Sequence, residues 1–274
     1  MTSTSLARAC TAEVVGTFLL VLFGTGSVAA AVVTGAQVGL WQVAVVWGFG
    51  VTLAIYATAA VSGAHLNPAV TLAVAVLRPD TFPRSRVLPY WGAQLAGAAL
   101  AGAVVLATFH PFIERFEAAE GIERGAPGSE RSAMVFGEYF PNPAIFGTGP
   151  EAEALVSPLM AAGIEAFGTA VLVCMIFALT EPRNGVRPKW LAPFFIGFTV
   201  AVLISLFAPA TQAGWNPARD LGPRLVALAA GWGEIAIPGP RGGFWVYLAG
   251  PLIGGLAGGL LYDRLIRPGL PPEA

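Results

Sequence analysis

Two asparagines, each followed by proline and alanine, could carry a defined hydrogen-bonding chemistry. They belong to the tripeptides Asn67-Pro68-Ala69 and Asn216-Pro217-Ala218. Asparagine is a favoured helix N-cap, and proline suits the first helical position because its missing N–H would have no intrahelical partner there. If each side-chain oxygen caps the helix that follows, each amide NH₂ is left as a fixed donor. The expected chemistry is therefore reversible binding of an uncharged oxygen atom.

Each tripeptide begins a short apolar segment, over about 68–77 and about 217–230. A helix of about ten residues rises about 15 Å, which is half of the roughly 30 Å hydrocarbon core of a bilayer. We expect two half-helices that enter a membrane from opposite faces and meet N-terminus to N-terminus. Each N-terminus carries about half a positive charge, so the meeting point would repel cations and break a proton-conducting chain of waters.

The rest of the chain predicts membrane-spanning helices. It is 55% hydrophobic and only 11% charged, with a mean hydropathy of +0.70, whereas a soluble protein has roughly 25% charged residues. Six stretches reach the roughly 20 apolar residues that a span requires: about 11–33, 39–62, 87–109, 159–180, 190–208 and 243–262. The predicted fold class is therefore an all-α membrane protein with six transmembrane helices and two re-entrant half-helices.

The two halves of the chain repeat one another. The matched positions are Glu13 with Gly16-Thr17 and Glu165 with Gly168-Thr169, Gly48-Phe49 and Gly197-Phe198, and Tyr90 with Gly97 and Tyr247 with Gly254. An odd number of spans in each half gives the halves opposite orientations, and such inverted repeats place functional sites near the midplane. We expect residues 1–274 to form one domain, with repeat one over about 6–110, a connecting segment over about 111–157 and repeat two over about 158–267.

The distribution of charge predicts the orientation. If six spans alternate, one side of the membrane receives Arg8, Arg78, Arg84, Arg86, Arg183, Arg187, Lys189, Arg264 and Arg267. The connecting segment, on the other side, holds eight glutamates and three arginines. Because Lys and Arg are enriched on the cytoplasmic side, both termini are predicted to be cytoplasmic and the connecting segment external.

A third copy of the tripeptide, Asn142-Pro143-Ala144, lies in the connecting segment. It is soon followed by Gly147, Gly149 and Pro150, which would interrupt a helix. We therefore expect a loop turn there and no half-helix.

Enzymatic chemistry has no basis in this sequence. The spans contain no nucleophile–base set and no metal-ligand cluster, and Cys10 and Cys174 suggest neither a disulfide framework nor a metal site. We expect no enzyme activity, no cofactor, no metal and no nucleic-acid partner. A secondary transporter also uses inverted repeats and broken helices, and Glu13 and Glu165 would be its only candidate coupling carboxylates.

The segments Ser62-Gly63-Ala64-His65-Leu66-Asn67-Pro68-Ala69-Val70 and Asn216-Pro217-Ala218-Arg219-Asp220 resemble the two signatures of the major intrinsic protein (aquaporin) family. Three features are similar to the aquaglyceroporin, or glycerol uptake facilitator, branch: Asp220, Arg224 and Phe140-Pro141-Asn142-Pro143. The resemblance implies a right-handed six-helix bundle with a pore in each monomer, a homotetramer and a place in the cell (inner) membrane. It also implies passive flow of glycerol and other small uncharged solutes, with some water and without protons or ions.

The resemblance also implies a selectivity filter made by Trp47, Ile204, Ala213 and Arg219. Glycerol facilitators usually have Gly at the position of Ile204 and Phe at that of Ala213. A nodulin-26-like channel for small neutral solutes therefore stays open as an alternative, and so does a water-selective channel, although the latter would have His in place of Ile204.

Two filter residues also have structural alternatives. Arg219 lies three residues after Asn216 and so on the same helix face, but it could instead pair with a loop carboxylate. Trp47 could simply pack in the core. It lies too deep to belong to the interfacial belt that we assign to Trp41, Trp190, Trp232 and Trp245.

The acidic residues inside the spans need partners, because a buried charge in a membrane is costly. We expect Glu13 and Glu165 to accept backbone N–H groups from the unwound loops before the half-helices. That would aim the carbonyls of Gly63, Ala64 and His65, and of Ala213, Gly214 and Trp215, into the pore. The His65 side chain could line the pore or brace the loop, and we favour bracing. Asp220 and Arg224 form a favourable i,i+4 pair that would hold the second loop open.

Overall fold

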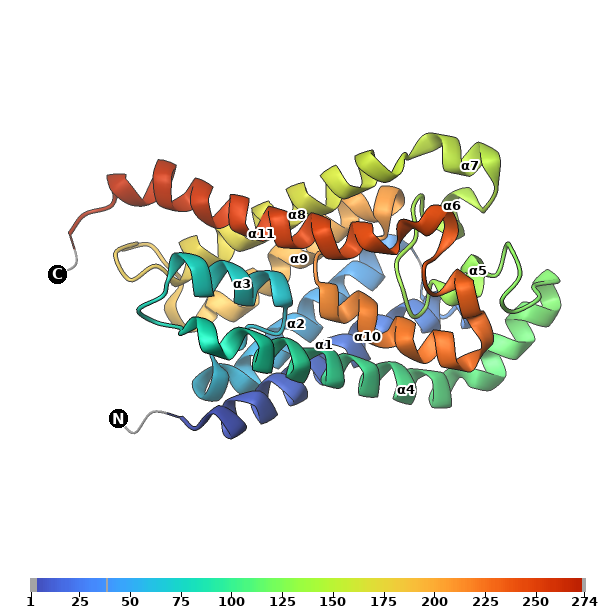
Figure 1. The fold of residues 1–274 in the computed structure, drawn as a ribbon, viewed down its shortest axis with the longest axis horizontal. Coiled ribbons are helices and arrows are strands. Elements are labelled where there is room, and N and C mark those ends of the chain that lie inside the picture. The colour runs from blue at the N-terminus through green and yellow to red at the C-terminus, as the bar shows by residue number, and fades with distance from the viewer. Residues whose placement is uncertain (1–3, 38, 273–274) are drawn as a thin grey trace.

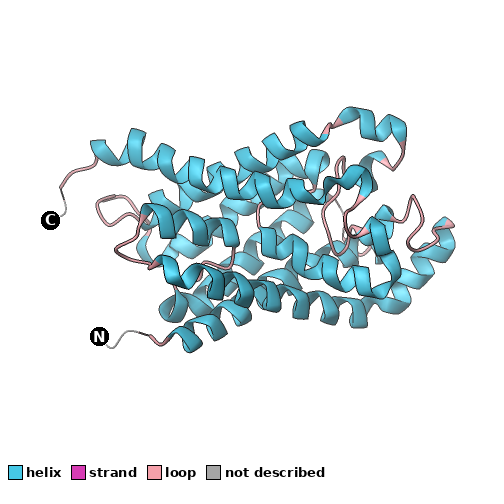
Figure 2. Ribbon diagram, in the orientation of Figure 1, coloured by secondary structure: helices cyan, strands magenta, loops and turns pink. Residues whose placement is uncertain are grey.

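The computed structural model describes residues 4–37 and 39–272, and these fold into helices joined by loops, without strands (Figure 2). Six long apolar helices are long enough to cross a membrane, as predicted. Their α-helical parts are α1 (Leu6–Thr34), α2 (Leu40–Ser62), α4 (Val87–Glu120), α8 (Pro158–Thr180), α9 (Ala192–Thr211) and α11 (Val246–Leu261). With the adjoining 3₁₀ and π turns, the third, fifth and sixth of these helices extend over Arg84–Glu120, Lys189–Thr211 and Pro240–Gly269. The shorter helices are α3 (Pro68–Leu77), α5 (Glu130–Ala133), α6 (Pro143–Phe146), α7 (Pro150–Leu155) and α10 (Pro217–Ala227).

Glycines at the matched positions of the two halves allow the long helices to approach closely. A Cβ atom at Gly97 would overlap the Val14 carbonyl, where α4 crosses α1, and one at Gly254 would overlap the Ala166 carbonyl, where α11 crosses α8. The α2–α9 contact joins the two halves at Gly48 and Gly197. A Cβ atom on either glycine would overlap the backbone carbonyl of the other. In a lipid bilayer the hydrophobic effect does not drive helices together, so close packing of this kind is needed to stabilise their association.

The two half-helices lie in the middle of the bundle (Figure 1). Each packs against the last long helix of the opposite half: α3 against α11, and α10 against α4. The structure gives α3 the predicted bounds. In contrast, α10 ends at Ala227 rather than near 230 and continues as a π-helical turn, Leu228–Trp232, in which Gly231 has a φ of +103° that a regular helix does not accommodate.

Two features of the connecting segment can be compared with the prediction: the end of α4 and the third tripeptide. Helix α4 continues to Glu120 instead of ending near 109, and it passes through Pro111, whose missing N–H removes only one bond of the helix. The third tripeptide starts only the four-residue helix α6, which ends at Gly147 with a φ of +73°. No half-helix follows this tripeptide, as predicted, but the expected loop turn is a single turn of α-helix capped by Asn142.

Trp232 contradicts the prediction of an interfacial residue. Its side chain is fully buried, its indole N–H donates to Ser132 Oγ at 3.0 Å, and it packs between Phe136 and the guanidinium of Arg124. The π-helical turn after α10 carries this residue inward, which the local sequence does not reveal. Trp41, Trp190 and Trp245 are exposed, as an interfacial position requires.

Candidate functional site

The two Asn-Pro-Ala tripeptides meet and bond to each other reciprocally. Asn67 Oδ1 accepts the Ala69 N–H at 2.8 Å, and Asn216 Oδ1 accepts the Ala218 N–H at 3.1 Å, so each asparagine caps its own half-helix. Asn67 Nδ2 then donates to the Trp215 carbonyl at 2.9 Å, while Asn216 Nδ2 donates to the carbonyl of Leu66 at 2.8 Å. One N–H of each amide thus links the two halves, and no residue in 4–37 or 39–272 accepts a hydrogen bond from the other.

A buried glutamate holds the unwound loop before each half-helix. Glu13 accepts the backbone N–H groups of His65 at 2.9 Å and Leu66 at 2.7 Å. Glu165 accepts those of Gly214 at 3.0 Å and Trp215 at 2.7 Å. Both carboxylates are fully buried. The correspondence between the halves is therefore present in the hydrogen bonds as well as in the sequence.

The loops have the same strained backbone in both halves. Ala64 and Leu66 have φ values of +49° and +53°, and Ala213 and Trp215 have +64° and +48°. Non-glycine residues rarely adopt this left-handed region. Non-helical backbone at membrane depth is tolerated only where protein or a water-filled space satisfies its polar groups, and the two glutamates supply such partners.

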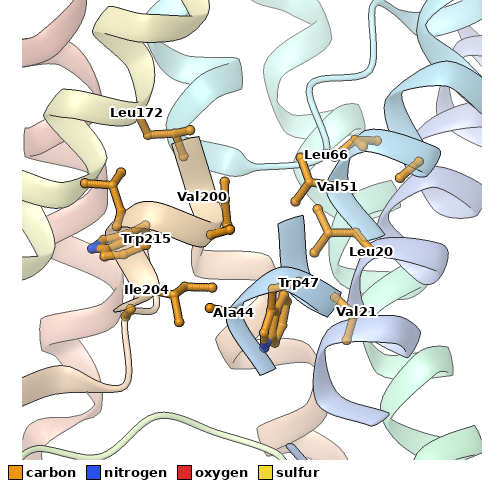
Figure 3. Packing of buried hydrophobic residues seen from close by; sticks show 14 of the residues in the cluster. Leu20, Val21, Ala44, Trp47, Val51, Leu66, Leu172, Val200, Ile204 and Trp215 are labelled. Carbon is orange, nitrogen blue, oxygen red and sulfur yellow. The ribbon is translucent and has the colours of Figure 1, made fainter. Parts of the chain in front are cut away.

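A cavity of about 620 Å³ runs past both asparagines. All of the predicted carbonyl-bearing loop residues line it, namely Gly63, Ala64, His65, Ala213, Gly214 and Trp215. Apolar side chains from four long helices line it as well, including Leu20 of α1, Val51 of α2, Leu172 of α8 and Val200 of α9 (Figure 3). We call this cavity the conduit. Its wall combines a row of loop polar groups with a hydrocarbon surface.

The four predicted filter residues all line the conduit, near one end of it. The Arg219 guanidinium lies 4.0 Å from the centroid of the Trp47 ring, and its Nη2 donates to the Ala213 carbonyl at 3.3 Å. Ile204 also lines the conduit and belongs to the same buried cluster as Trp47 (Figure 3). Arg219 also forms an ion pair with Glu138 of the connecting segment. The arginine therefore both faces the conduit and pairs with a loop carboxylate.

These features can be set against known proteins. The sequence model for the family described as major intrinsic protein matches residues 1–262. The chain belongs to the major intrinsic protein family. It is consequently a multi-pass membrane protein, as its six apolar helices indicate.

Several relatives in this family are similar over nearly their whole length. The chain is 42% identical to a glycerol uptake facilitator protein of Haemophilus influenzae over 269 residues, which is 97% of each chain. It is 41% identical to a propanediol uptake facilitator of Citrobacter freundii, over 97% of this chain and 95% of the relative. The X-ray structure of the aquaglyceroporin from Plasmodium falciparum superimposes with a TM-score of 0.81 at 26% identity, covering 96% of this chain and 98% of that one.

In this member of the major intrinsic protein family, the connecting segment is bonded directly to the site. Asp220 Oδ1 accepts the Glu138 N–H at 2.7 Å, and Arg224 pairs with Asp220 Oδ2 at 2.7 Å while a second N–H of Arg224 donates to the Glu138 carbonyl. Gln212 Oε1 accepts the Tyr139 N–H at 2.8 Å. Burial raises the pKa of the Tyr139 hydroxyl, which donates to the Ile235 carbonyl at 3.0 Å.

Glu138 and Gln212 are the site residues that the sequence did not reveal. Glu138 is one of eight glutamates in the connecting segment, and no pattern distinguishes it. Gln212 ends α9 with a φ of +58°, a position where glycine or asparagine would be the usual signal. The ring of His65 packs against Phe82 with a centroid distance of 4.5 Å, in agreement with the favoured bracing role, and the residue is also part of the conduit wall.

Proposed function

We propose that this protein is a passive transmembrane channel for glycerol and other small uncharged solutes, with some permeability to water and none to protons or ions. The observation that carries the proposal is the reciprocal junction of Asn67 and Asn216 on the wall of the conduit. The names of its relatives, which include glycerol and propanediol uptake facilitators, support the same solute class and favour a channel over an enzyme.

The two kinds of wall suit a polyol. A solute that leaves water must exchange its hydrogen bonds for others, or it meets a penalty for each unpaired polar group. The loop carbonyls would accept hydrogen bonds from the solute hydroxyls, and Asn67, Asn216 and Arg219 would donate to them. The aliphatic wall would contact the carbon backbone of the solute. A pore that conducts only water would not need such an apolar wall.

Ion exclusion follows from the charges at the junction. The N-termini of α3 and α10 each contribute about half a positive charge at the junction, and Arg219, whose charge is paired with Glu138, adds fixed N–H donors beside it. A water at the junction would turn its oxygen toward the two amides and donate outward in both directions. A proton could not be relayed through such a water, so the chain of hydrogen bonds would be broken there.

The filter is assigned to Trp47, Ile204, Ala213 and Arg219. The ring of Trp47 and the guanidinium of Arg219 would set the width and bind the solute hydroxyls. In comparison with the usual glycerol facilitator, Ile204 adds bulk to the wall and Ala213 removes it. Because this combination of filter residues resembles that of the nodulin-26-like channels, such a channel for small neutral solutes is one alternative. A water-selective channel is the other alternative, and comparison of glycerol and water permeability tests it.

We also propose the assembly and placement of the channel. The conduit lies within one chain, and four chains would form a homotetramer in the lipid bilayer of the cell (inner) membrane. Residues 6–110 and 158–267 are taken as the inverted repeats, with 111–157 connecting them. The basic residues at one end, including Arg84, Arg183 and Arg187, support cytoplasmic termini.

Purified protein in lipid vesicles provides the test. Light scattering should record glycerol uptake faster than in empty vesicles, without an imposed proton or sodium gradient. Rapid water flow with glycerol uptake at the background rate would indicate a water-selective channel. Uptake that required an ion gradient would indicate a secondary transporter instead.

A further inference from the structure

A second arginine lines the conduit at the end opposite Arg219. Arg78 caps the C-terminus of α3, and its guanidinium lies 4.3 Å from the centroid of the Phe177 ring on α8. It forms a two-pronged ion pair with Asp263, with Nη1–Oδ2 and Nη2–Oδ1 distances of 2.5 and 2.6 Å. Phe177 lines the conduit as well.

This arrangement matches the one at the filter. There, too, an arginine lies over an aromatic ring, Trp47 at 4.0 Å, and pairs with a carboxylate, Glu138. In both places the ring lies over the guanidinium, and a carboxylate pairs with both terminal nitrogens of Arg78 but with Nη1 alone of Arg219. The orientation of the remaining N–H groups is therefore fixed before a solute arrives, which reduces the entropy lost on binding.

The N–H groups of Arg78 can be counted. A guanidinium has five N–H donors. Asp263 receives one from each terminal nitrogen, and the Leu77 carbonyl receives the second one of Nη1 at 2.9 Å. Among the residues that the structure describes, no hydrogen-bond partner takes the Nε–H or the second Nη2–H. These two donors lie on the same edge of the guanidinium, and together they match a pair of neighbouring oxygen atoms.

A hydrogen-bond acceptor and apolar side chains line the conduit together with Arg78. Glu181 lines the conduit at the end of α8, is almost fully buried, and pairs with Arg267 at 2.9 Å. Val74 and Ile176 line the adjoining wall. Donors, an acceptor and hydrocarbon thus occur together, as they do around Arg219.

We propose that Arg78, with Phe177 and Glu181, forms a second polyol-binding site at this end of the conduit, so that a solute is selected at both ends. The Nε–H and Nη2–H of Arg78 donate hydrogen bonds to two vicinal hydroxyl oxygens, the Glu181 carboxylate accepts a hydrogen bond from a hydroxyl, and the Phe177 ring contacts the carbons. This inference rests on the proposed function, since it assumes that the conduit carries polyols.

The proposed solute binding must be distinguished from a purely structural role of the same ion pairs. Asp263 and Arg267 belong to the C-terminal part of the chain, and Arg183 also holds that part, through the carbonyls of Leu270 at 2.5 Å and Pro271 at 2.8 Å. The pairs could therefore serve only to fasten it. The charge-swapped double variant Arg78→Asp with Asp263→Arg separates the two roles, because it can restore fastening but moves the guanidinium away from the α3 end.

The experiment measures glycerol, 1,3-propanediol and water permeability in the same vesicles. In 1,3-propanediol the two hydroxyls are one carbon further apart, so it cannot use both donors equally well. We expect Arg78→Gln to lower the glycerol to 1,3-propanediol ratio at least threefold, the charge swap to leave it low, and Arg78→Lys to lie between. Arg183→Gln is the matched control, since Arg183 holds the C-terminal part but is absent from the conduit wall, and its ratio should equal that of the wild type.

Two outcomes would overturn the inference. One is an unchanged ratio in Arg78→Gln or, if that variant does not fold, in Arg78→Lys, while the wild type conducts glycerol. The other is restoration of the wild-type ratio by the charge swap, which would assign Arg78 to fastening alone. Failure of the wild type to conduct glycerol would instead reject the proposed function.

Discussion

At the scale of single residues, the filter end of the conduit is defined by what surrounds Arg219. The guanidinium is held between the Trp47 ring, the Ala213 carbonyl and the carboxylate of Glu138. Because these contacts fix the side-chain rotamer, the remaining N–H groups can face the conduit without a further loss of conformational entropy. The small side chain of Ala213 leaves the space beside it open, and this residue is therefore the most direct place to test the filter.

Substitution Ala213→Phe should narrow the conduit beside Arg219. An aromatic ring there would collide with a branched or longer polyol before it obstructs a water molecule. We expect the flux of a five-carbon polyol to fall about tenfold relative to that of water, because a close-fitting site discriminates by about this factor against a solute with one methylene group too many. Stopped-flow light scattering on one vesicle preparation measures both. An equal loss for all solutes would show that residue 213 does not lie at the filter.

At the scale of elements, the loop before each half-helix is held by a buried carboxylate that belongs to a long helix. Glu165 of α8 accepts two backbone N–H groups before α10 and also the hydroxyl of Thr211 at 2.7 Å. Glu13 of α1 does the same for the loop before α3 and accepts in addition the amide of Gln94 at 2.8 Å. The positions of Asn67 and Asn216 thus follow from the long helices.

Substitution Glu165→Gln should destabilise this loop. The amide keeps one acceptor oxygen but turns an NH₂ group toward the N–H groups that the second oxygen accepted. Leaving buried donors unpaired costs about 1–3 kcal/mol for each group, so the thermal midpoint in detergent should fall and solute flux should decrease. Glu114→Gln, on an exposed part of α4, is the control and should leave both unchanged. Equal midpoints for the two variants would contradict the supporting role.

The crossing of α1 and α4 permits a second test at this scale. Gly97 faces the Val14 backbone with no room for a Cβ, whereas Gly92, on the same helix, has no atom within 4 Å of the equivalent position. We expect Gly97→Leu to destabilise the bundle by about 1–3 kcal/mol or more, as overpacking does, and Gly92→Leu to be tolerated. Size-exclusion profiles and thermal unfolding of the two variants provide the comparison. Similar behaviour would mean that the crossing does not depend on close contact.

The sequence predicted the long helices and the starts of both half-helices, because these depend on local properties. A span requires a long apolar run, and an Asn-Pro pair caps a helix by its own chemistry, so both can be read from adjacent residues. The path of α4 beyond residue 109 and the inward turn of Trp232 could not be predicted, since tertiary contacts decide them. Glu138 was missed for the same reason: its partners, Arg219 and Arg224, lie more than 80 residues away in the sequence.

At the scale of the whole molecule, the function depends on the two halves facing each other. Each amide of the junction bonds to the opposite half, and each half-helix packs against the last long helix of the opposite half. An arginine over an aromatic ring stands near each end of the conduit. The protein therefore places fixed hydrogen-bond donors at three successive levels along the path proposed for the solute, and the two arginines among them are paired with carboxylates.

Simultaneous recording of solute and proton movement tests this arrangement most directly. Vesicles that contain the protein and a pH-sensitive dye would receive a glycerol gradient together with an imposed membrane potential. We predict glycerol entry well above that of empty vesicles, unaffected by the potential, with a proton leak no greater than that of empty vesicles. A proton or cation current carried by the purified protein, or glycerol entry at the level of empty vesicles, would contradict the assignment of the Asn67–Asn216 junction as an ion-excluding passage for neutral solutes.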